Sequence, residues 1–383
     1  METIWFCIVT VMLAAYVLLD GFDLGAGAIH LFAARRNEER RAILGAIGPV
    51  WDGNEVWLLA AGGVLYFAFP GLYASAFSGF YLALMVVLWL LMLRGLAIEF
   101  RGQIDNPLWR SFWDVALCGS SALLAIFYGA ALGNVVRGVP LNRDGYFFVP
   151  LWTNFRTGEN PGIIDWFTVL VGVSALLVLS MHGALWVAYK TRGDLEIRAA
   201  GIAAKLYWPV CALILGVTVA SFSVQPHIAE ALSLHPFLWI FALIGASGLL
   251  GVWLCLQSGL HLGSFFCSAV FITGLLCSAA FGLYPYVLPS SGAVSLGLTV
   301  QNVAAPVYGL RIGLIWWTPA FLLALGYSTF VYRHFRGKTP IEATPDVRHG
   351  TLRIDPDAET DSGSGRSAVS ERAAADSPVE CRI

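Results

Sequence analysis

The sequence Leu19-Asp-Gly-Phe-Asp-Leu-Gly25 places two carboxylic acids inside an apolar run that extends from about residue 4 to residue 32. Such a run is long enough for a membrane-spanning helix, which needs about 20 mostly apolar residues. On a helix, Asp20 and Asp23 are three residues apart and share one face. The two glycines, four residues apart, let a second backbone approach closely. The segment therefore predicts a helix in the membrane whose acids point into protein.

Composition extends this interpretation to most of the chain. Of the 383 residues, 57% are hydrophobic and only 13% are charged, about half the charged share of a soluble protein. The apolar stretches number about nine, and they lie near residues 4–32, 50–69, 73–93, 113–132, 165–188, 206–222, 237–256, 262–285 and 312–332. We therefore predict an all-α integral membrane protein whose polytopic transmembrane domain covers residues 1–332.

The basic residues of the connecting loops predict the orientation, because Lys and Arg collect on the cytoplasmic side. One side holds most of them: Arg35, Arg36, Arg40, Arg41, Arg94, Arg101, Arg110, Lys190, Arg192, Arg198 and Lys205. The other side holds Arg137, Arg143, Arg156 and Arg311. The N-terminus is thus expected outside and the C-terminus in the cytoplasm. Residues 333–383, rich in Asp, Glu, Ser, Ala and Arg, are predicted to form a disordered cytoplasmic tail.

The same composition excludes several classes of protein. A soluble enzyme or a secreted domain needs a charged surface, which this chain lacks. A nucleic-acid binder needs a basic stripe, so nucleic acid is not an expected partner. The cysteines form no C-x-x-C pair and no cluster with histidine at zinc spacing, so no metal site is predicted. His182 is interpreted as an ordinary polar contact near a helix end, and no histidine pair has a spacing suited to haem ligation.

A second acidic motif, Pro49-Val-Trp-Asp-Gly-Asn-Glu-Val-Trp57, opens the next apolar stretch. It places Asp52 and Glu55 three residues apart, again on one helix face. Because one short cytoplasmic loop joins the two helices, we expect all four carboxylates to lie close together. The third stretch ends in Arg94 and Glu99 at the same surface.

Ionisable groups at membrane depth are costly and are therefore candidates for function. Clustered carboxylates favour each other's protonated form, which suits them to passing protons. The predicted proton path comprises Asp20, Asp23, Asp52, Glu55, Trp57 and Glu99, with Arg94 as the charge partner. A structural alternative stays open, in which the acids and Arg94 form buried ion pairs and helix caps that fix the packing.

Several motifs resemble those of subunit II of the cytochrome bd quinol oxidases. They are Asp20–Gly25, Gly48–Trp57, Ala76–Tyr81, Trp109-Arg110 with Trp113-Asp114, Gly133-Asn134 with Gly138–Pro140, and Tyr284–Ser291. The resemblance covers roughly residues 1–332. It implies two four-helix bundles plus one peripheral helix. It also implies that the acids matching Asp23, Asp52 and Glu99, with Trp57, line a cytoplasmic proton entry.

The resemblance further implies the partners and cofactors. A haem-bearing subunit I would carry haem b and haem d, and no cofactor would be bound by ligands of this chain. Small single-helix subunits, a bound quinone, membrane lipid and quinol are compatible with it. The complex would oxidise quinol and reduce oxygen to water in the bacterial cytoplasmic (inner) membrane.

Two rival functions remain from the sequence. The first is a stand-alone proton-coupled membrane transporter, whose hallmark is a midplane site between broken helices. The glycine pair Gly62-Gly63 permits such a break, but the acids lie towards one side of the membrane. The second is an assembly subunit that stabilises the oxidase partner without any proton route.

Overall fold

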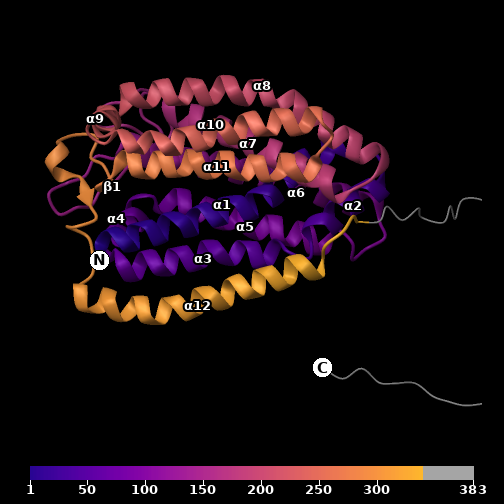
Figure 1. Ribbon diagram of the computed structural model, residues 1–383, viewed down its shortest axis with the longest axis horizontal. Coiled ribbons are helices and arrows are strands. Elements are labelled where there is room, and N and C mark those ends of the chain that lie inside the picture. Colours follow the sequence, from indigo (N-terminus) through magenta and orange to yellow (C-terminus); the bar gives the residue numbers. More distant parts are fainter. Residues whose placement is uncertain (340–383) are drawn as a thin grey trace, which may run out of the picture. The chain divides into compact units, whose positions relative to one another are not determined.

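The structure is a computed structural model, and it describes residues 1–339. Long helices dominate it (Figure 1): α1 (Glu2–Ala33), α3 (Trp51–Ala68), α5 (Tyr81–Phe100), α6 (Pro107–Arg137), α7 (Trp166–Lys190), α8 (Gly193–Val224), α10 (Trp239–Gln257), α11 (His261–Leu283) and α12 (Val307–His334). The shorter elements are α2 (Asn37–Ile47), α4 (Pro70–Gly79), α9 (Pro226–Leu234), the 3₁₀ turns Pro236–Leu238 and Val294–Leu296, and the antiparallel strands β1 (Tyr286–Leu288) and β2 (Leu298–Thr299). The part of the predicted tail that begins at residue 340 lies outside the described residues.

Within residues 1–339, eight helices are long and apolar enough to cross a membrane. They are α1, α5, α6, α7, α8, α10 with its preceding turn, α11 and α12. The remaining long helix, α3, has 18 residues and would span about 27 Å. Its first turns contain Asp52, Asn54 and Glu55, which lower its hydropathy. The structure thus confirms a mostly helical membrane fold, with eight candidate spans where the sequence predicts about nine.

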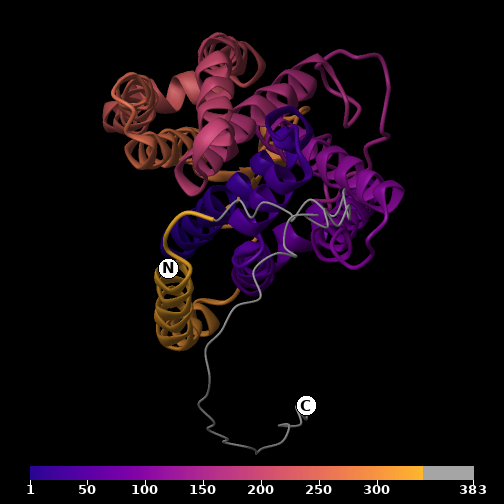
Figure 2. The ribbon, with the colours of Figure 1, turned by 90° about the vertical axis from the view of Figure 1, so that its right-hand side faces the viewer.

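The helices pack as two groups (Figure 2). The first group contains α1, α3, α5 and α6, and the second contains α7, α8, α10 and α11. The groups join where α7 packs on α1 and α6, so α1 and α7 have the most buried apolar windows, at 50% and 67%. By contrast, no residue in the apolar window of α12 is buried. This helix therefore lies at the edge of the described unit.

Helix boundaries differ from the apolar stretches for a physical reason. A hydropathy scan detects the part of a helix in hydrocarbon, whereas a helix continues until a cap or a breaker ends it. Thus α6 begins at Pro107, after Asn106 accepts hydrogen bonds from two backbone N–H groups. The stretch predicted at 73–93 is divided between α4 and α5. The loop after α1 contains the unpredicted helix α2.

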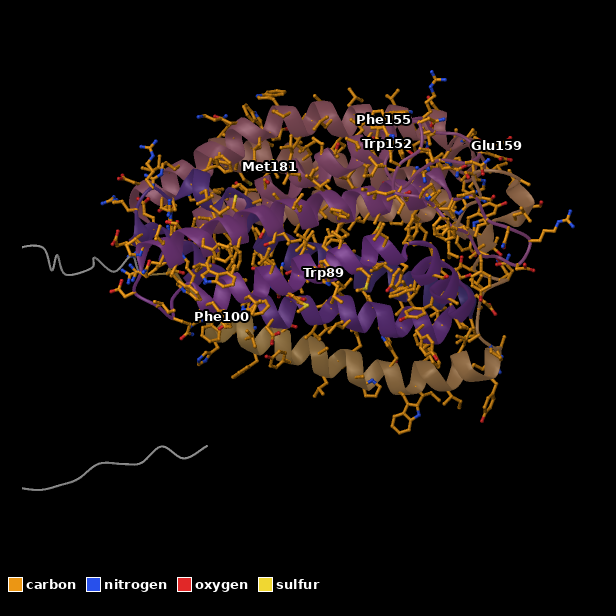
Figure 3. The ribbon with its side chains drawn as sticks, turned by 180° about the vertical axis from the view of Figure 1, so that it is seen from behind. Trp89, Phe100, Trp152, Phe155, Glu159 and Met181 are labelled. Atoms are coloured by element: carbon orange, nitrogen blue, oxygen red, sulfur yellow. The ribbon has the colours of Figure 1, made fainter. Side chains whose placement is uncertain are left out.

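Side chains with nitrogen and oxygen atoms gather at the two ends of the helices, and mostly apolar side chains lie along the middle of the helices (Figure 3). The exposed rings of Trp89 and Phe100, labelled there, belong to α5. Apolar side chains along the outside of a helix bundle are typical of contact with lipid. We call the end that carries α2 the α2 end, and the end that carries β1 and β2 the strand end.

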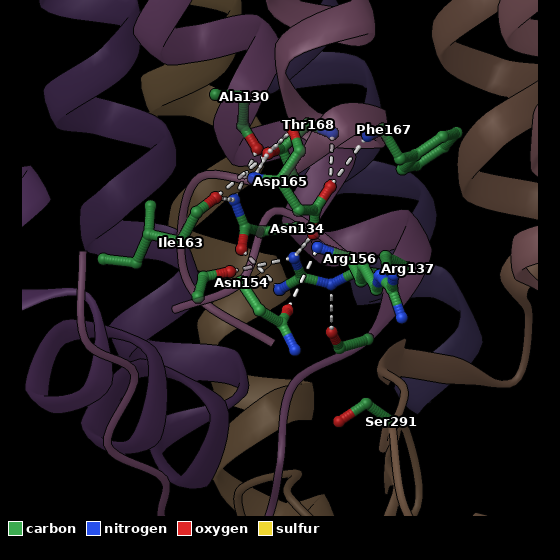
Figure 4. A network of polar contacts seen from close by, with 12 residues as sticks. Ala130, Asn134, Arg137, Asn154, Arg156, Ile163, Asp165, Phe167, Thr168 and Ser291 are labelled. Carbon is green, nitrogen blue, oxygen red and sulfur yellow. Dashed lines mark hydrogen bonds and ion pairs between the residues drawn. The ribbon is translucent and has the colours of Figure 1, made fainter. Parts of the chain in front are cut away.

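A polar network closes the strand end (Figure 4). Arg137 of α6 forms an ion pair with Asp165 and donates to the carbonyl of Gly162 at 3.0 Å and to Asn134 Oδ1 at 2.7 Å. The other carboxylate oxygen of Asp165 accepts from two backbone N–H groups in the first turn of α7. One aspartate thus caps α7 and fixes the long loop before it.

Candidate functional site

Asp20 and Asp23 lie on the part of α1 that is enclosed by other helices. Their exposed fractions are 0% and 1%. The glycine notch beside them faces α7, where a Cβ on Gly25 would meet the backbone of Leu179. The carboxylates instead meet α3 and α5. The structure therefore agrees with the prediction that both acids point into protein.

Arg94 of α5 joins two acids through its guanidinium fork. Its Nη1 lies 2.7 Å from Asp20 Oδ1, and its Nη2 lies 2.9 Å from Glu55 Oε2. The Arg94 and Asp20 side chains are 1% and 0% exposed, whereas Glu55 is 24% exposed. Through these two charge-assisted hydrogen bonds, Arg94 connects the fully buried Asp20 to the half-buried Glu55.

Asn54 of α3 holds the second buried acid. Its Nδ2 donates to Asp23 Oδ2 at 2.8 Å and to the carbonyl of Leu19 at 3.1 Å. Its Oδ1 accepts from the Tyr332 hydroxyl of α12 at 2.9 Å. In the sequence Asn54 stands between two acids with no predicted role, and no motif points to Tyr332. No local pattern could have found that residue, because 278 positions separate it from Asn54.

The cluster, defined here as Asp20, Asp23, Asn54, Glu55 and Arg94, is incompletely paired. Asp20 Oδ2, Asp23 Oδ1 and Arg94 Nε are buried and have no hydrogen-bond partner among the described residues. The cluster contains three carboxyl groups and one guanidinium, which pairs with Asp20 and Glu55 and not with Asp23. Full ionisation would bury an uncompensated negative charge, which is costly. Bound protons can supply the missing charge balance, so the cluster is suited to taking up protons.

The other predicted site residues lie around this cluster. Asp52, in the first turn of α3, is exposed and forms no hydrogen bond or ion pair with the cluster residues. Glu99, near the end of α5, is also exposed. Trp57 is buried at 6% and packs with Tyr16 and with the ring of Phe321 on α12. The structure thus joins Asp20 and Glu55 through Arg94 and holds Asp23 on Asn54. It leaves Asp52 and Glu99 at the surface.

A second polar network lies at the α2 end. Asp114 of α6, 0% exposed, lies 2.7 Å from His30 Nε2, 2.9 Å from Arg40 Nη1 and 2.5 Å from Arg101 Nε. Two cationic side chains and one imidazole therefore surround a single carboxylate. In the sequence Asp114 belongs to one of the family-like motifs and has no predicted site role.

Glu39 fastens α2 to the bundle. Its Oε2 accepts from the backbone N–H groups of Arg35 at 2.7 Å and Arg36 at 3.1 Å, and it lies 2.7 Å from Arg198 Nη2 of α8. Burial would raise the pKa of Glu39, but the ion pair with Arg198 and the hydrogen bonds from the two backbone groups outweigh it and lower this pKa from 4.5 to about 2. Stabilisation by Glu39 is therefore complete above pH 4.5 and is lost as the pH falls towards 2.

We expect hydrogen exchange of residues 37–47, corrected for the intrinsic rate, to become faster across this pH range. The Glu39→Gln variant should exchange faster at neutral pH already, because it lacks the carboxylate. Asp105, 89% exposed in its pair with Arg110, offers a matched control as Asp105→Asn. Unchanged protection of residues 37–47 in Glu39→Gln would refute this role.

His182 has both ring nitrogens occupied. Its Nε2 lies 3.2 Å from the carbonyl oxygen of Leu18, which can only accept, so this nitrogen carries the hydrogen. Its Nδ1 then accepts from Ser268 Oγ at 2.8 Å. The ring stacks on Phe265, so its role is packing between α1, α7 and α11. Among the described residues, no group of three or more His, Cys, Asp or Glu could hold a metal ion.

The fold and the cluster define a polytopic helical membrane protein with ionisable groups enclosed between its first helices. A family model described as cytochrome bd terminal oxidase subunit II matches residues 1–335. The chain therefore belongs to the subunit II family of the cytochrome bd terminal oxidases, multi-pass proteins of the bacterial inner membrane.

Individual relatives agree with this assignment. The chain is 33% identical to a probable cytochrome oxidase subunit 2 of Haemophilus influenzae, over 88% of this chain and 94% of that protein. It is 30% identical to the cytochrome bd-I ubiquinol oxidase subunit 2 of Escherichia coli K12, over 91% and 97%. A solved bd oxidase from Geobacillus thermodenitrificans has a similar fold, with a TM-score of 0.65 at 17% identity, covering 87% of this chain and 98% of that one.

Proposed function

We propose that this chain is the non-haem subunit II of an oxidase that oxidises quinol and reduces oxygen to water. In this proposal it stabilises a haem-bearing subunit I and supplies a cytoplasmic proton-entry path. Haem b and haem d belong to subunit I, and quinone and small single-helix subunits are further components to be sought in the purified complex. The named relative from Escherichia coli, a ubiquinol oxidase subunit, supports the choice of substrate.

The topology that accompanies this proposal has nine membrane spans, with α3 counted as the second. The N-terminus lies outside and the C-terminus in the cytoplasm, which makes the α2 end cytoplasmic. The charge pattern supports this orientation, because the loops at the α2 end hold most of the basic residues. The packing of α12 at the edge of two four-helix groups supports the arrangement that the family resemblance implies.

One observation carries the proton path: exposure falls stepwise from the α2 end into the bundle. Asp52 is exposed, Glu55 is 24% exposed, and Asp20 and Asp23 are 0% and 1% exposed. Arg94 links Glu55 to Asp20 and compensates their charge. Asp23, whose side-chain partner is the neutral amide of Asn54, is the acid best placed to gain and lose a proton.

The Asp23→Asn variant tests the path. We expect oxygen consumption by the purified oxidase to fall roughly tenfold or more, because loss of a proton-transferring group costs about 10²–10⁴ in rate. Haem content should persist, because the amide can still hydrogen-bond to Asn54. Turnover and the reduced-minus-oxidised haem spectrum are measured together, and Asp105→Asn serves as the exposed control.

The other outcomes discriminate between the rivals. Wild-type turnover in Asp23→Asn would remove the proton path and leave the structural interpretation of the cluster. Loss of haem together with activity would indicate an assembly subunit. The stand-alone transporter is not favoured, because the chain matches an oxidase subunit family over residues 1–335.

A further inference from the structure

A groove runs between α12 and the first group of helices. Its volume is about 560 Å³, and its walls come from α1, from α12 and from Trp57 of α3. Figures 1 and 2 show α12 along the outer edge of the described unit. Because α1 and α12 are both membrane-spanning candidates, this groove lies between two helices at membrane depth.

The chemistry of the groove changes in order along α12. Phe321 and Leu325 form an apolar wall, Ser328 and Thr329 add hydroxyls, and Arg333 begins a cationic end that includes Arg336. The apolar wall continues on α1 with Val11, Ala15 and Leu18. From Phe321 to Arg333 a helix rises about 18 Å. This order matches the parts of a glycerophospholipid. The apolar wall suits an acyl chain, the hydroxyls suit the ester carbonyls, and the arginines suit the phosphate.

These polar groups are not used elsewhere within residues 1–339. No hydrogen bond or ion pair is made there by the side chains of Ser328, Thr329, Arg333 or Arg336, and both arginines are exposed. A hydroxyl without a hydrogen bond is energetically unfavourable in a membrane helix, since lipid tails neither donate nor accept hydrogen bonds. The groups thus remain available to an occupant of the groove.

The charge of the lining selects the class of headgroup. The groove is lined by two arginines and by no aspartate or glutamate. A zwitterionic headgroup would place its ammonium group near two guanidinium groups, with no carboxylate in the lining to pair with it. An anionic headgroup carries only negative charge, which the two arginines attract.

We propose that this groove binds one anionic glycerophospholipid. Its phosphate lies on Arg333 and Arg336, its ester carbonyls accept from the hydroxyls of Ser328 and Thr329, and one acyl chain lies along Ala15 and Leu325. Trp57 of the predicted proton path also lines this groove, but the residues that would contact the lipid lie outside the acid cluster. The proposal is tested by lipid retention and not by turnover, so it can fail or hold separately from the proton path.

The test uses the chain purified with its native partners and washed in detergent. Phosphatidylglycerol and phosphatidylcholine are added separately, and the lipid retained per complex is measured by native mass spectrometry. We expect one phosphatidylglycerol to be retained at least tenfold more strongly than phosphatidylcholine. The double variant Arg333→Gln and Arg336→Gln should lose this preference. Arg311→Gln, at the opposite end of α12, should keep it.

Two further measurements complete the design. Ala15→Phe, which fills the apolar wall, should lower retention of both lipids while the arginines are intact. The haem spectrum of every variant reports whether the complex has assembled. Equal retention of the two lipids, an unchanged preference in the double variant, retention of a quinone in place of phospholipid, or competition by inorganic phosphate alone would overturn the proposal.

Discussion

The Arg94→Leu variant is expected to fail to accumulate as a folded chain, or to unfold at a much lower temperature than the wild type. The guanidinium is the only cation paired with Asp20 in the described residues, and that carboxylate is 0% exposed. Removing one member of a buried ion pair leaves an uncompensated charge, which typically costs 3–5 kcal/mol. Such a loss is a large fraction of the stability of most proteins.

Thermal unfolding of the purified complex and its yield from membranes measure this effect. The combination Arg94→Leu with Asp20→Asn should recover part of the lost stability, because it removes the orphaned charge together with its partner. The unfolding temperature of Arg94→Lys should lie between those of the wild type and Arg94→Leu. An ammonium keeps the positive charge but cannot bridge two acids through a planar fork. A single Arg94→Leu variant with wild-type unfolding temperature would contradict the importance of this pair.

The second large effect is expected from Gly183, where α7 crosses α1. A Cβ at this position would lie 2.1 Å from the backbone nitrogen of Ala26, and a Cβ on Gly25 would lie 1.8 Å from the carbonyl oxygen of Leu179. These neighbours are backbone atoms, so a change of side-chain rotamer cannot relieve the contact. Gly183→Val should therefore separate the two helix groups and prevent recovery of an intact complex, and Gly183→Ala should weaken it by at least the 1–3 kcal/mol typical of overpacking.

Gly216 of α8 provides the matched control. An added Cβ there has no neighbour within 4 Å, so Gly216→Ala should leave assembly unchanged and slightly favour the helix. Complex yield and unfolding temperature are compared for the three variants. If Gly183→Val assembled as well as Gly216→Ala, the close crossing would not be what joins the two groups.

The sequence was most informative where a local pattern decides the outcome. Long apolar stretches predict helices in a membrane, and the spacing of Asp20 and Asp23 predicts a shared buried face. The same spacing was less reliable for Asp52 and Glu55. Asp52 occupies the first turn of α3, where a side chain near the helix end is easily exposed, whereas Glu55 is one turn deeper and reaches Arg94.

Contacts between distant segments could not be obtained from pattern alone. Tyr332 reaches Asn54 only because α12 packs beside α3, and Asp114 gathers His30, Arg40 and Arg101 from three other parts of the chain. Each of these residues looks ordinary in its own segment. Their roles depend on how the helices pack, which hydropathy does not describe.

The hydrogen bond between Tyr332 and Asn54 also has a consequence for the order of synthesis. Asn54 enters the membrane with α3 early in translation, whereas Tyr332 lies near the end of α12, the last helix of the described chain. The hydrogen bond between Tyr332 and Asn54 Oδ1 therefore forms only after the other described helices have been synthesised. A nascent chain that stops before α12 leaves Asn54 Oδ1 without this donor, so the amide that holds Asp23 is fully hydrogen-bonded only once α12 is in place.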